Sequence, residues 1–466
     1  MTQLGTETNP LRVAIIGSGP AAFYAAEAFV RQTNIFSRID MFDRLPTPFG
    51  LVRYGVAPDH AKIKSVTKVY EKIASQPCFR FFGNVEFGKH VMLADLRQYY
   101  HQILFATGAQ TDRHMGIPGE DLKRSHPATE FVAWYNGHPD YRDHQFDLSV
   151  ERVAVVGVGN VAIDVARILC RTRDELAKTD IADYALEALS KSQVKEVYLI
   201  GRRGPAQAAF TTPEVKEVGE MLDADCFTHP AEVKLDALSQ AAIDKDPDPS
   251  LQKKIEVLQS YASHQPTGKS RRLYIRFLVS PTELIGDANG RVTKMKWVRN
   301  TLVKDEWGGL KAKATEQGGE LNVDMVFRSV GYRGVALPDV PFNDKAGTIL
   351  NDKGRVLDPA AKQPRVGEYA SGWIKRGPSG VIGTNKPDSV ETVNLMLEDL
   401  QKGNVLAPAH PGVDDAAQFV ASRHPRFITF ADWLKLDQLE IANGVKQGRP
   451  RVKFGRVEEM LKAVGK

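Results

Sequence analysis

The sequence predicts an α/β protein built on two parallel sheets, each with helices on both faces. Residues 13–29 read VAIIGSGPAAFYAAEAF, an apolar strand followed by a glycine turn and a helix. Residues 153–169 read VAVVGVGNVAIDVARIL and repeat that order. Because short apolar strands continue to alternate with helices after each unit, we expect each unit to begin a separate three-layer domain.

The domain boundaries are predicted from where this pattern restarts. Strands of the first unit run as far as ILFATGAQ, and a loop rich in Pro and Gly leads to the second unit at residue 151. The tail carries YASGW, a glycine-rich loop and two amphipathic helices. We expect a discontinuous first domain, residues 1–110 and 360–466, with a second domain, residues 111–359, inserted into it. Within the second domain, residues 214–262 are expected to be helical, solvated surface.

Composition excludes several classes of protein. Of 466 residues, 42% are hydrophobic and 26% charged, which is ordinary for a soluble globular chain, and the net charge of +5 is too weak to indicate nucleic-acid binding. No segment approaches the roughly 20 apolar residues that span a bilayer, and the first eleven residues lack the apolar run of a secretory signal. The isolated cysteines Cys78, Cys170 and Cys226 fit a reducing cytoplasm. They exclude a CxxC dithiol and a cysteine-bound cluster, and we predict no metal site.

Both glycine turns fit the pattern G-x-G-x-x-A. The matching residues are Gly17, Gly19 and Ala22 in the first unit and Gly157, Gly159 and Ala162 in the second. The first glycine permits the tight turn, and the second lets a pyrophosphate approach the backbone at the helix N-terminus. The small third residue lets the helix pack on the strand. Two such units predict two Rossmann-like dinucleotide-binding domains.

The residue at the end of the next strand separates the two sites. In the first unit that strand, IDMFD, ends in Asp43, which can accept hydrogen bonds from ribose hydroxyls. In the second unit, VYLIG is followed by Arg202 and Arg203, and paired guanidiniums bind a ribose 2′-phosphate. The second site is therefore predicted to bind NADP. We expect FAD at the first, because a flavin accepts a hydride and returns single electrons, whereas two nicotinamides could not store them.

Several long strings resemble one family, the adrenodoxin-reductase-type ferredoxin–NADP reductases, particularly the actinobacterial members. The strings are PTPFGLVRYGVAPDH, FFGNV, GNVAIDVARIL, GRRGPAQAAFT and GWIKRGPSGVIGTNK, and the resemblance covers almost the whole chain. It implies an FAD-dependent NADPH:ferredoxin oxidoreductase. Such an enzyme takes a hydride from NADPH onto FAD and passes single electrons to a ferredoxin-like iron–sulfur protein.

The resemblance also implies the cofactor contacts. Those to the flavin fall on Ala22, Asp43, Leu51, Val85, Trp373, Gly380, Val381 and Ile382. Those to NADP fall on Arg113, Asn160, Val161, Ala162, Ile163, Arg202, Arg203, Glu214 and again Gly380. The sequence departs from related patterns at two positions: many family members have Glu in place of Asp43, and Gly372–Trp373 stands where the wider two-dinucleotide flavoproteins have a Gly-Asp pair.

Two polar residues, His60 and Asp164, match positions that the family places beside the flavin ring. They are candidate catalytic residues, and a proton-handling role and a role in positioning NADP both remain open. Ferredoxins are strongly acidic, so a basic docking face is also expected. Its candidate residues are Lys269, Arg271 and Arg272 in GKSRRLYIR, joined by Lys375 and Arg376.

Three other functions are alternatives. One is an NADPH diaphorase or oxidase whose acceptor is a quinone or a dye. Another is a relay subunit resembling the small chain of glutamate synthase, but such chains carry an N-terminal cysteine cluster that is absent here. A nucleotide-binding regulator is disfavoured because nothing in the sequence resembles an output domain.

Overall fold

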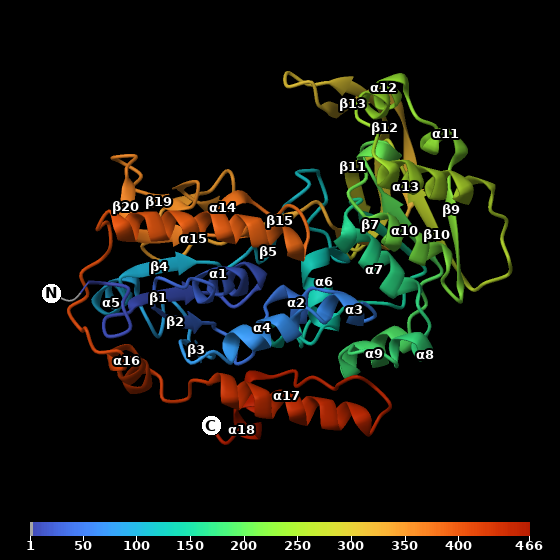
Figure 1. The fold of residues 1–466 in the computed structure, drawn as a ribbon. Coiled ribbons are helices and arrows are strands. Elements are labelled where there is room, and N and C mark those ends of the chain that lie inside the picture. The colour runs from blue at the N-terminus through green and yellow to red at the C-terminus, as the bar shows by residue number, and fades with distance from the viewer. Residues whose placement is uncertain (1–2) are drawn as a thin grey trace.

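The computed structural model describes residues 3–466 and contains two α/β domains that lie side by side (Figure 1). The first domain is built on a seven-stranded sheet in the order β18-β19-β20-β4-β1-β2-β3. Its strands from β20 to β3 are parallel, and β18 and β19 add an antiparallel edge. The strands are β1 (Leu11–Ile16), β2 (Ser37–Phe42), β3 (Phe79–Phe82), β4 (Gln102–Phe105), β18 (Asn351–Asp352), β19 (Arg355–Leu357) and β20 (Pro364–Ala370).

Two apolar clusters cover the two faces of this sheet and make the three layers that the sequence predicts. One cluster includes Phe23, Tyr70, Met396 and Trp433 and lies under α1 (Pro20–Val30), α4 (Thr67–Ala74), α15 (Asn385–Gln401) and α17 (Phe430–Val445). The other lies under α5 (Leu93–Tyr99) and α16 (Asp415–Arg423). Because both faces are covered, the central strand β1 is buried at every residue.

The second domain repeats this architecture on a six-stranded sheet in the order β6-β14-β7-β8-β10-β9, all of it parallel. The strands are β6 (Ser125–Pro127), β7 (Arg152–Val156), β8 (Glu196–Ile200), β9 (Ala224–Thr228), β10 (Arg271–Arg276) and β14 (Met325–Arg328). Its core packs against α6 (Ala128–Tyr135), α7 (Asn160–Cys170), α9 (Asp183–Ser190), α10 (Thr212–Gly219) and α13 (Pro249–Ser260). The edge strand β9 lies inside residues 214–262, a stretch expected to be helical.

A three-stranded antiparallel sheet projects from the second domain, at the top of Figure 1. Its strands are β11 (Val279–Gly286), β12 (Val292–Lys304) and β13 (Leu310–Asn322). Shorter helices complete the chain: α2 (Leu51–Tyr54), α3 (Ala61–Lys64), α8 (Arg173–Leu176), α11 (Pro230–Val233), α12 (Ala237–Lys245), α14 (Trp373–Arg376) and α18 (Val457–Ala463).

Within residues 3–466 the chain passes between the domains twice, at two short strands that pair with each other. These are β5 (Thr111–Asp112) and β15 (Tyr332–Arg333), which run antiparallel. After β15 the chain forms the hairpin of β16 (Phe342–Asn343) and β17 (Thr348–Ile349) and then enters the first sheet at β18. The expected end of the second domain at residue 359 is therefore wrong, because β18 and β19 already belong to the first sheet. The chain leaves the second domain at β15.

None of the helices in the described residues is both long and apolar enough to cross a membrane.

Candidate functional site

The first glycine turn joins β1 to α1, and its two glycines serve different purposes. Gly17 has φ +103°, and a Cβ there would lie 2.5 Å from the carbonyl oxygen of Ala106, just beyond β4. The fold itself therefore requires Gly17. Gly19 has an ordinary φ of −81°, and a Cβ there would have no neighbouring atom within 4 Å. The absence of a side chain at Gly19 instead keeps a cradle open at the N-terminus of α1.

The second glycine turn, between β7 and α7, divides its roles in the same way. Gly157 has φ +138°, and a Cβ there would collide with the carbonyl oxygen of Ser329, just beyond β14. Gly159 has φ −102°, and a Cβ there would meet no atom within 4 Å. Each domain thus presents an open helix N-terminus to which backbone N–H groups attract a phosphate.

Asp43 lies beside the first turn, directly after β2. Its carboxylate accepts hydrogen bonds from Ser18 Oγ at 2.5 Å and from the backbone N–H of Leu45 at 2.9 Å. Burial raises the pKa of Asp43 despite these two donors. The backbone N–H of Val85 donates to the Asp43 carbonyl oxygen at 2.8 Å. A short loop carrying an acceptor carboxylate therefore borders the first cradle.

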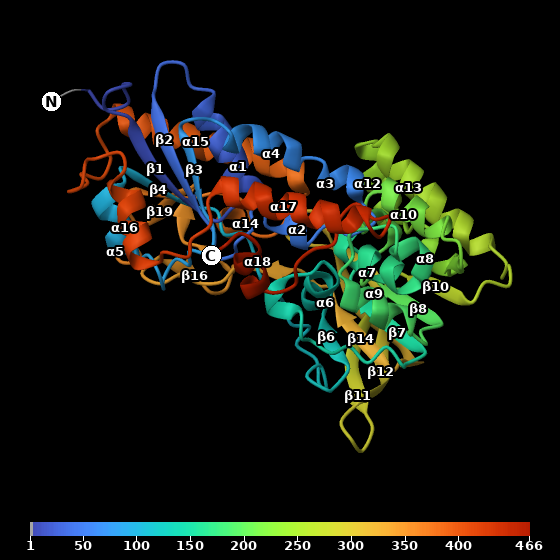
Figure 2. The same ribbon diagram turned by 90° about the horizontal axis from the view of Figure 1, so that it is seen from below.

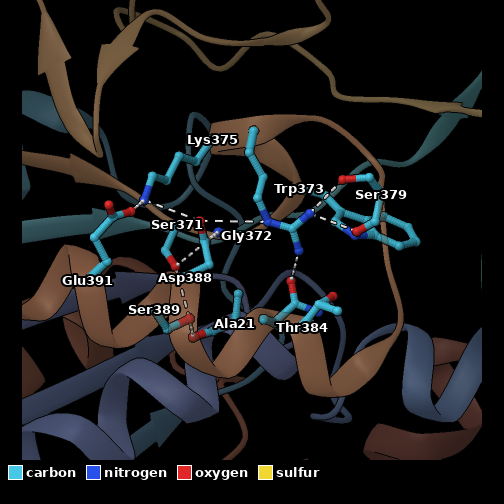
Figure 3. A network of polar contacts seen from close by, with 12 residues as sticks. Ala21, Ser371, Gly372, Trp373, Lys375, Ser379, Thr384, Asp388, Ser389 and Glu391 are labelled. Atoms are coloured by element: carbon cyan, nitrogen blue, oxygen red, sulfur yellow. Dashed lines mark hydrogen bonds and ion pairs between the residues drawn. The ribbon is translucent and has the colours of Figure 1, made fainter. Parts of the chain in front are cut away.

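A second loop reaches the first turn from the far end of the chain, at residues 372–384 (Figure 3). A Cβ at Gly372 would lie 2.5 Å from the Cβ of Ala21, so this loop contacts the first turn of α1. Trp373 is half-buried, and its indole Nε1 donates to the carbonyl oxygen of Ser379 at 3.1 Å. Arg376 donates to the same oxygen at 2.7 Å. These bonds hold the indole and the exposed Gly380–Val381 segment beside the first cradle.

The residues assigned to a flavin by resemblance therefore surround one turn. Ala22 is a buried residue of α1, Leu51 begins α2, and a Cβ at Gly50, just before Leu51, would lie 3.1 Å from Gly19 Cα. Ile382 packs against the core under α1.

The arginines that follow β8 carry unpaired charge. Arg202 is exposed and Arg203 half-buried, and neither side chain forms a hydrogen bond or ion pair within residues 3–466. Burial and the neighbouring Arg202 lower the pKa of Arg203. Two adjacent cations without carboxylate partners, at the carboxyl end of a parallel strand, form a site suited to an anion.

The other residues assigned to NADP lie around the start of α7 and at the ribbon between the domains. Asn160 Oδ1 accepts from the backbone N–H of Thr211 at 3.2 Å, and Glu214 accepts from the same N–H at 2.8 Å. Glu214 therefore caps α10 rather than projecting freely. Arg113 is exposed, and its Nε donates to the Tyr332 carbonyl oxygen at 3.4 Å. Val161, Ala162 and Ile163 form the first turn of α7.

His60 and Asp164 meet across the domain boundary, and the structure adds a partner that sequence reasoning missed. His60 Nδ1 lies 3.8 Å from Asp164 Oδ1, whereas His60 Nε2 lies 2.8 Å from Glu217 Oε2. The direct hydrogen bond of His60 is thus with Glu217 on α10. Only one feature of the sequence points to Glu217 as a site residue: it lies one helical turn after Glu214, a residue assigned to NADP.

A buried arginine organises the charges around this contact. Arg167 is fully buried, donating to Asp164 Oδ1 at 2.7 Å and to Asp59 Oδ2 at 2.8 Å. Burial raises the pKa of Asp164 to about 6, against the opposing effects of Arg167 and His60. Burial alone would also raise the pKa of Asp59, but Arg167 and Arg171 hold it below its usual range.

Comparison with known proteins shows where this architecture belongs. A family model described as "Pyridine nucleotide-disulphide oxidoreductase" matches residues 11–222. The chain is 45% identical to NADPH-ferredoxin reductase FprA of Mycobacterium tuberculosis, over 97% of this chain and 99% of the relative. It is 38% identical to the mitochondrial NADPH:adrenodoxin oxidoreductase of Arabidopsis thaliana, over 98% and 96%. The chain belongs to the NADPH-ferredoxin reductase family.

A solved structure of M. tuberculosis FprA in complex with NADPH matches with a TM-score of 0.92 at 44% identity, covering 98% of this chain and all of that one. The resemblance inferred from the sequence strings and the α/β fold with two Rossmann-like domains are both confirmed. The match to this reductase extends through both domains and the C-terminal helices.

The docking cluster expected from the sequence stays a prediction, and the structure gives it little support. Arg271 and Arg272 begin β10, which runs parallel to β8, so they lie at the opposite edge of the sheet from Arg202. Each has an acidic neighbour: Arg271 lies 3.5 Å from Asp223, and Arg272 lies 3.6 Å from Glu196.

The other cations of that cluster are also engaged. Lys269 Nζ donates to the Met221 carbonyl oxygen at 2.7 Å. Lys375 is buried and contacts Asp388 at 3.1 Å and Glu391 at 2.7 Å (Figure 3).

Potential metal ligands converge in one place within the described residues, at His114, Glu120 and Asp121. Glu120 already accepts from His114 Nδ1 and from the backbone N–H of Gly116 at 2.8 Å. The group lies in the exposed loop before β6 and takes no part in either dinucleotide cradle.

The raised pKa of Asp164 predicts a pH-dependent stability. A carboxyl whose pKa rises from 3.8 to about 6 on folding contributes stability at low pH that is lost as the pH rises through 6. Asn does not titrate. The free energy of unfolding of Asp164→Asn should therefore rise by about 2 kcal/mol relative to that of the wild type as the pH goes from 4 to 7. Urea unfolding across that range measures the difference.

Asp180→Asn is the matched control. Lys453 and Lys64 hold the pKa of Asp180 below its usual range against burial, so its contribution has the opposite sign. This variant should be less stable than the wild type throughout pH 4–7. A constant difference between Asp164→Asn and the wild type would show that Asp164 does not titrate in this range.

Proposed function

We propose that the chain is an NADPH:ferredoxin oxidoreductase that binds FAD at the turn of Gly17 and Gly19 and NADP at the turn of Gly157 and Gly159. The observation that carries the proposal is the pair of open helix N-termini. Within residues 3–466, the second alone has two unpaired arginines at the neighbouring strand end. The full-length relatives named above support the overall reaction. The three cysteines are free, which supports a cytoplasmic location.

The residues of the first domain fit FAD. Gly19 leaves room for a pyrophosphate at α1, Asp43 offers a carboxylate to the ribose, and Trp373 lies on the loop braced against Ala21. When bound, the flavin supplies the redox chemistry, accepting a hydride and releasing single electrons. The protein binds and orients it.

The residues of the second domain fit NADP. Gly159 leaves the α7 N-terminus open, and Arg202 and Arg203 offer ten N–H donors between them to a 2′-phosphate. The contact of His60 with Glu217 and Asp164 spans the two domains at this site. We propose that His60 positions the nicotinamide half of NADP, and that Asp164, whose pKa burial raises to about 6, can hold a proton there in mildly acidic solution.

For the acidic iron–sulfur partner we propose a docking surface on α3, α4 and α10. Lys62, Lys68 and Lys216 form no ion pair within residues 3–466 and are exposed. Ile63, which follows Lys62 on α3, has a relative exposure of 43%. Figure 2 shows α3 beside α10, at the junction that His60 and Glu217 bridge. An apolar centre with a cationic rim suits an acidic protein.

Gly19→Val and Gly159→Val test the assignment of the two cradles. The wild type should be yellow, contain one FAD per chain and reduce a plain two-iron ferredoxin with NADPH, with quinone and dioxygen as competitors. A side chain at Gly19 meets no protein atom, so Gly19→Val should fold yet lose FAD.

Gly159→Val is the matched control, since it should keep FAD and lose NADPH-dependent reduction. Visible spectra and anaerobic titration with NADPH measure both. Normal flavin content in Gly19→Val would contradict the assignment of the first cradle, and failure of the wild type to reduce ferredoxin would contradict the function.

Arg202→Ala with Arg203→Ala tests the nucleotide preference. Each lost charge-assisted bond to a 2′-phosphate costs about 1.5–3 kcal/mol, so the half-saturating NADPH concentration should rise roughly tenfold or more per contact. The value for NADH should change little, because NADH lacks that phosphate. An equal rise in the half-saturating concentrations of NADPH and NADH would show that the two arginines do not bind the 2′-phosphate.

Lys62→Glu with Lys68→Glu tests the docking surface. The KM for ferredoxin should rise, and its salt dependence should flatten, because steering charges act over about 8–10 Å at physiological salt. Reduction of a small dye by NADPH should be unchanged. Arg271→Glu with Arg272→Glu is the control and should leave ferredoxin turnover intact; if this control impairs turnover instead, the docking surface lies at the amino end of β10.

A further inference from the structure

The orientation of one domain against the other matters for hydride transfer, because the reacting atoms must come within about 3–3.5 Å. Each dinucleotide cradle belongs to a different domain. The two chain crossings form a ribbon of two residues per strand, β5 and β15. So short a ribbon connects the domains without fixing the angle between them.

A C-terminal segment, residues 446–456, lies along the domain junction and is called the arm here. It leaves α17, which lies beneath the first domain in Figure 1, and its loop extends toward α8 and α9 of the second. The arm folds back on α17 so closely that a Cβ at Gly444 would collide with the Arg451 backbone.

The arm is anchored to the first domain through Glu440. The backbone N–H of Val452 donates to the Glu440 carbonyl oxygen at 2.9 Å. The fully buried Glu440 carboxylate binds Arg53 at 2.5 Å and Arg451 at 3.3 Å. Because α17 packs into the first core through Trp433, the arm extends the first domain.

Arg449 extends from the arm into the second domain. Its side chain is 3% exposed, and its Nε donates to the Thr179 carbonyl oxygen at 3.1 Å. Its remaining nitrogens bind the Ile181 carbonyl oxygen and the Asp183 carboxylate. All three acceptors lie in the connection from α8 to α9 or at the start of α9.

Lys453 makes the second attachment. Its side chain is 1% exposed, and its Nζ lies 3.1 Å from Asp180 Oδ2 and 3.0 Å from the Asn136 carbonyl oxygen, both in the second domain. It also donates to the Arg53 carbonyl oxygen of the first domain at 3.2 Å. Lys64 of α3 binds the same Asp180 at 2.7 Å. One carboxylate of the second domain is thus held between two lysines of the first.

We propose that Arg449 and Lys453 are positioning residues: the arm fixes the second domain over the first, so that the two dinucleotides are aligned for hydride transfer. The inference rests on the proposed function. A third arm residue, Arg456, also crosses to the second domain, 2.7 Å from Asp143, but both side chains are exposed. An exposed pair contributes little to orientation. It is therefore the matched control.

The test uses the full-length, FAD-loaded protein and the variants Arg449→Met, Lys453→Met and Arg456→Met. Anaerobic stopped-flow at saturating NADPH should show flavin reduction at least tenfold slower in the first two, with a full primary deuterium isotope effect from 4-deuterated NADPH. The half-saturating NADPH concentration and the flavin content should be unchanged, since the arm touches neither cradle. Arg456→Met should match the wild type.

Asp183→Asn and Arg449→Lys keep the proposal testable if the methionine variants do not fold. The Asp183 side chain is 56% exposed, so its replacement leaves the core intact. Asp183→Asn should slow flavin reduction at least threefold, and Arg449→Lys should retain more of the rate than Arg449→Met.

Two outcomes would overturn the inference. The first is flavin reduction at the wild-type rate in folded, flavin-loaded Arg449→Met and Lys453→Met. The second, if those two variants do not fold, is flavin reduction at the wild-type rate in Asp183→Asn. If NADPH does not reduce the wild-type flavin at all, the proposed function fails, and the inference fails with it.

Discussion

Two backbone carbonyls determine where both cradles form. The Ala106 and Ser329 oxygens lie where a side chain at Gly17 or Gly157 would project, so each turn can pass its neighbouring strand only with glycine at that position. This close passage directs the N-termini of α1 and α7 toward the carboxyl ends of the strands. Asp43 and the Arg202–Arg203 pair also lie at those strand ends, so an acceptor or a pair of cations borders each cradle.

Charges of alternating sign then join the domains. At one contact the first domain supplies cations, Lys64, Arg449 and Lys453, to acceptors of the second. At the other contact the polarity reverses, and Asp59 of the first domain accepts from Arg167. Sliding one domain over the other would place like charges together, so the pattern specifies a single orientation. The His60–Glu217 contact is a consequence of that orientation.

The sequence was sufficient for what depends on local pattern. Strand-turn-helix order and the glycine spacing predicted both domains and both cradles. The sequence was insufficient where contacts between distant segments determine which residues pair and which short segments become strands. Glu217 was missed because its partner, His60, is brought near by domain packing rather than by spacing on one element. The boundary near residue 359 failed because two short strands, β18 and β19, become strands by pairing with β20, not by their own apolar period.

Two pairs of adjacent arginines show why strand direction decides function. Arg202–Arg203 and Arg271–Arg272 have the same composition and lie on neighbouring strands of one sheet. The first pair follows β8 and has no partner within the described residues, whereas the second begins β10 and lies near Asp223 and Glu196. In a parallel sheet the carboxyl edge is where helix N-termini gather and anions bind. The unpaired cations at that edge are therefore better candidates for a ligand site than the paired cations at the amino edge.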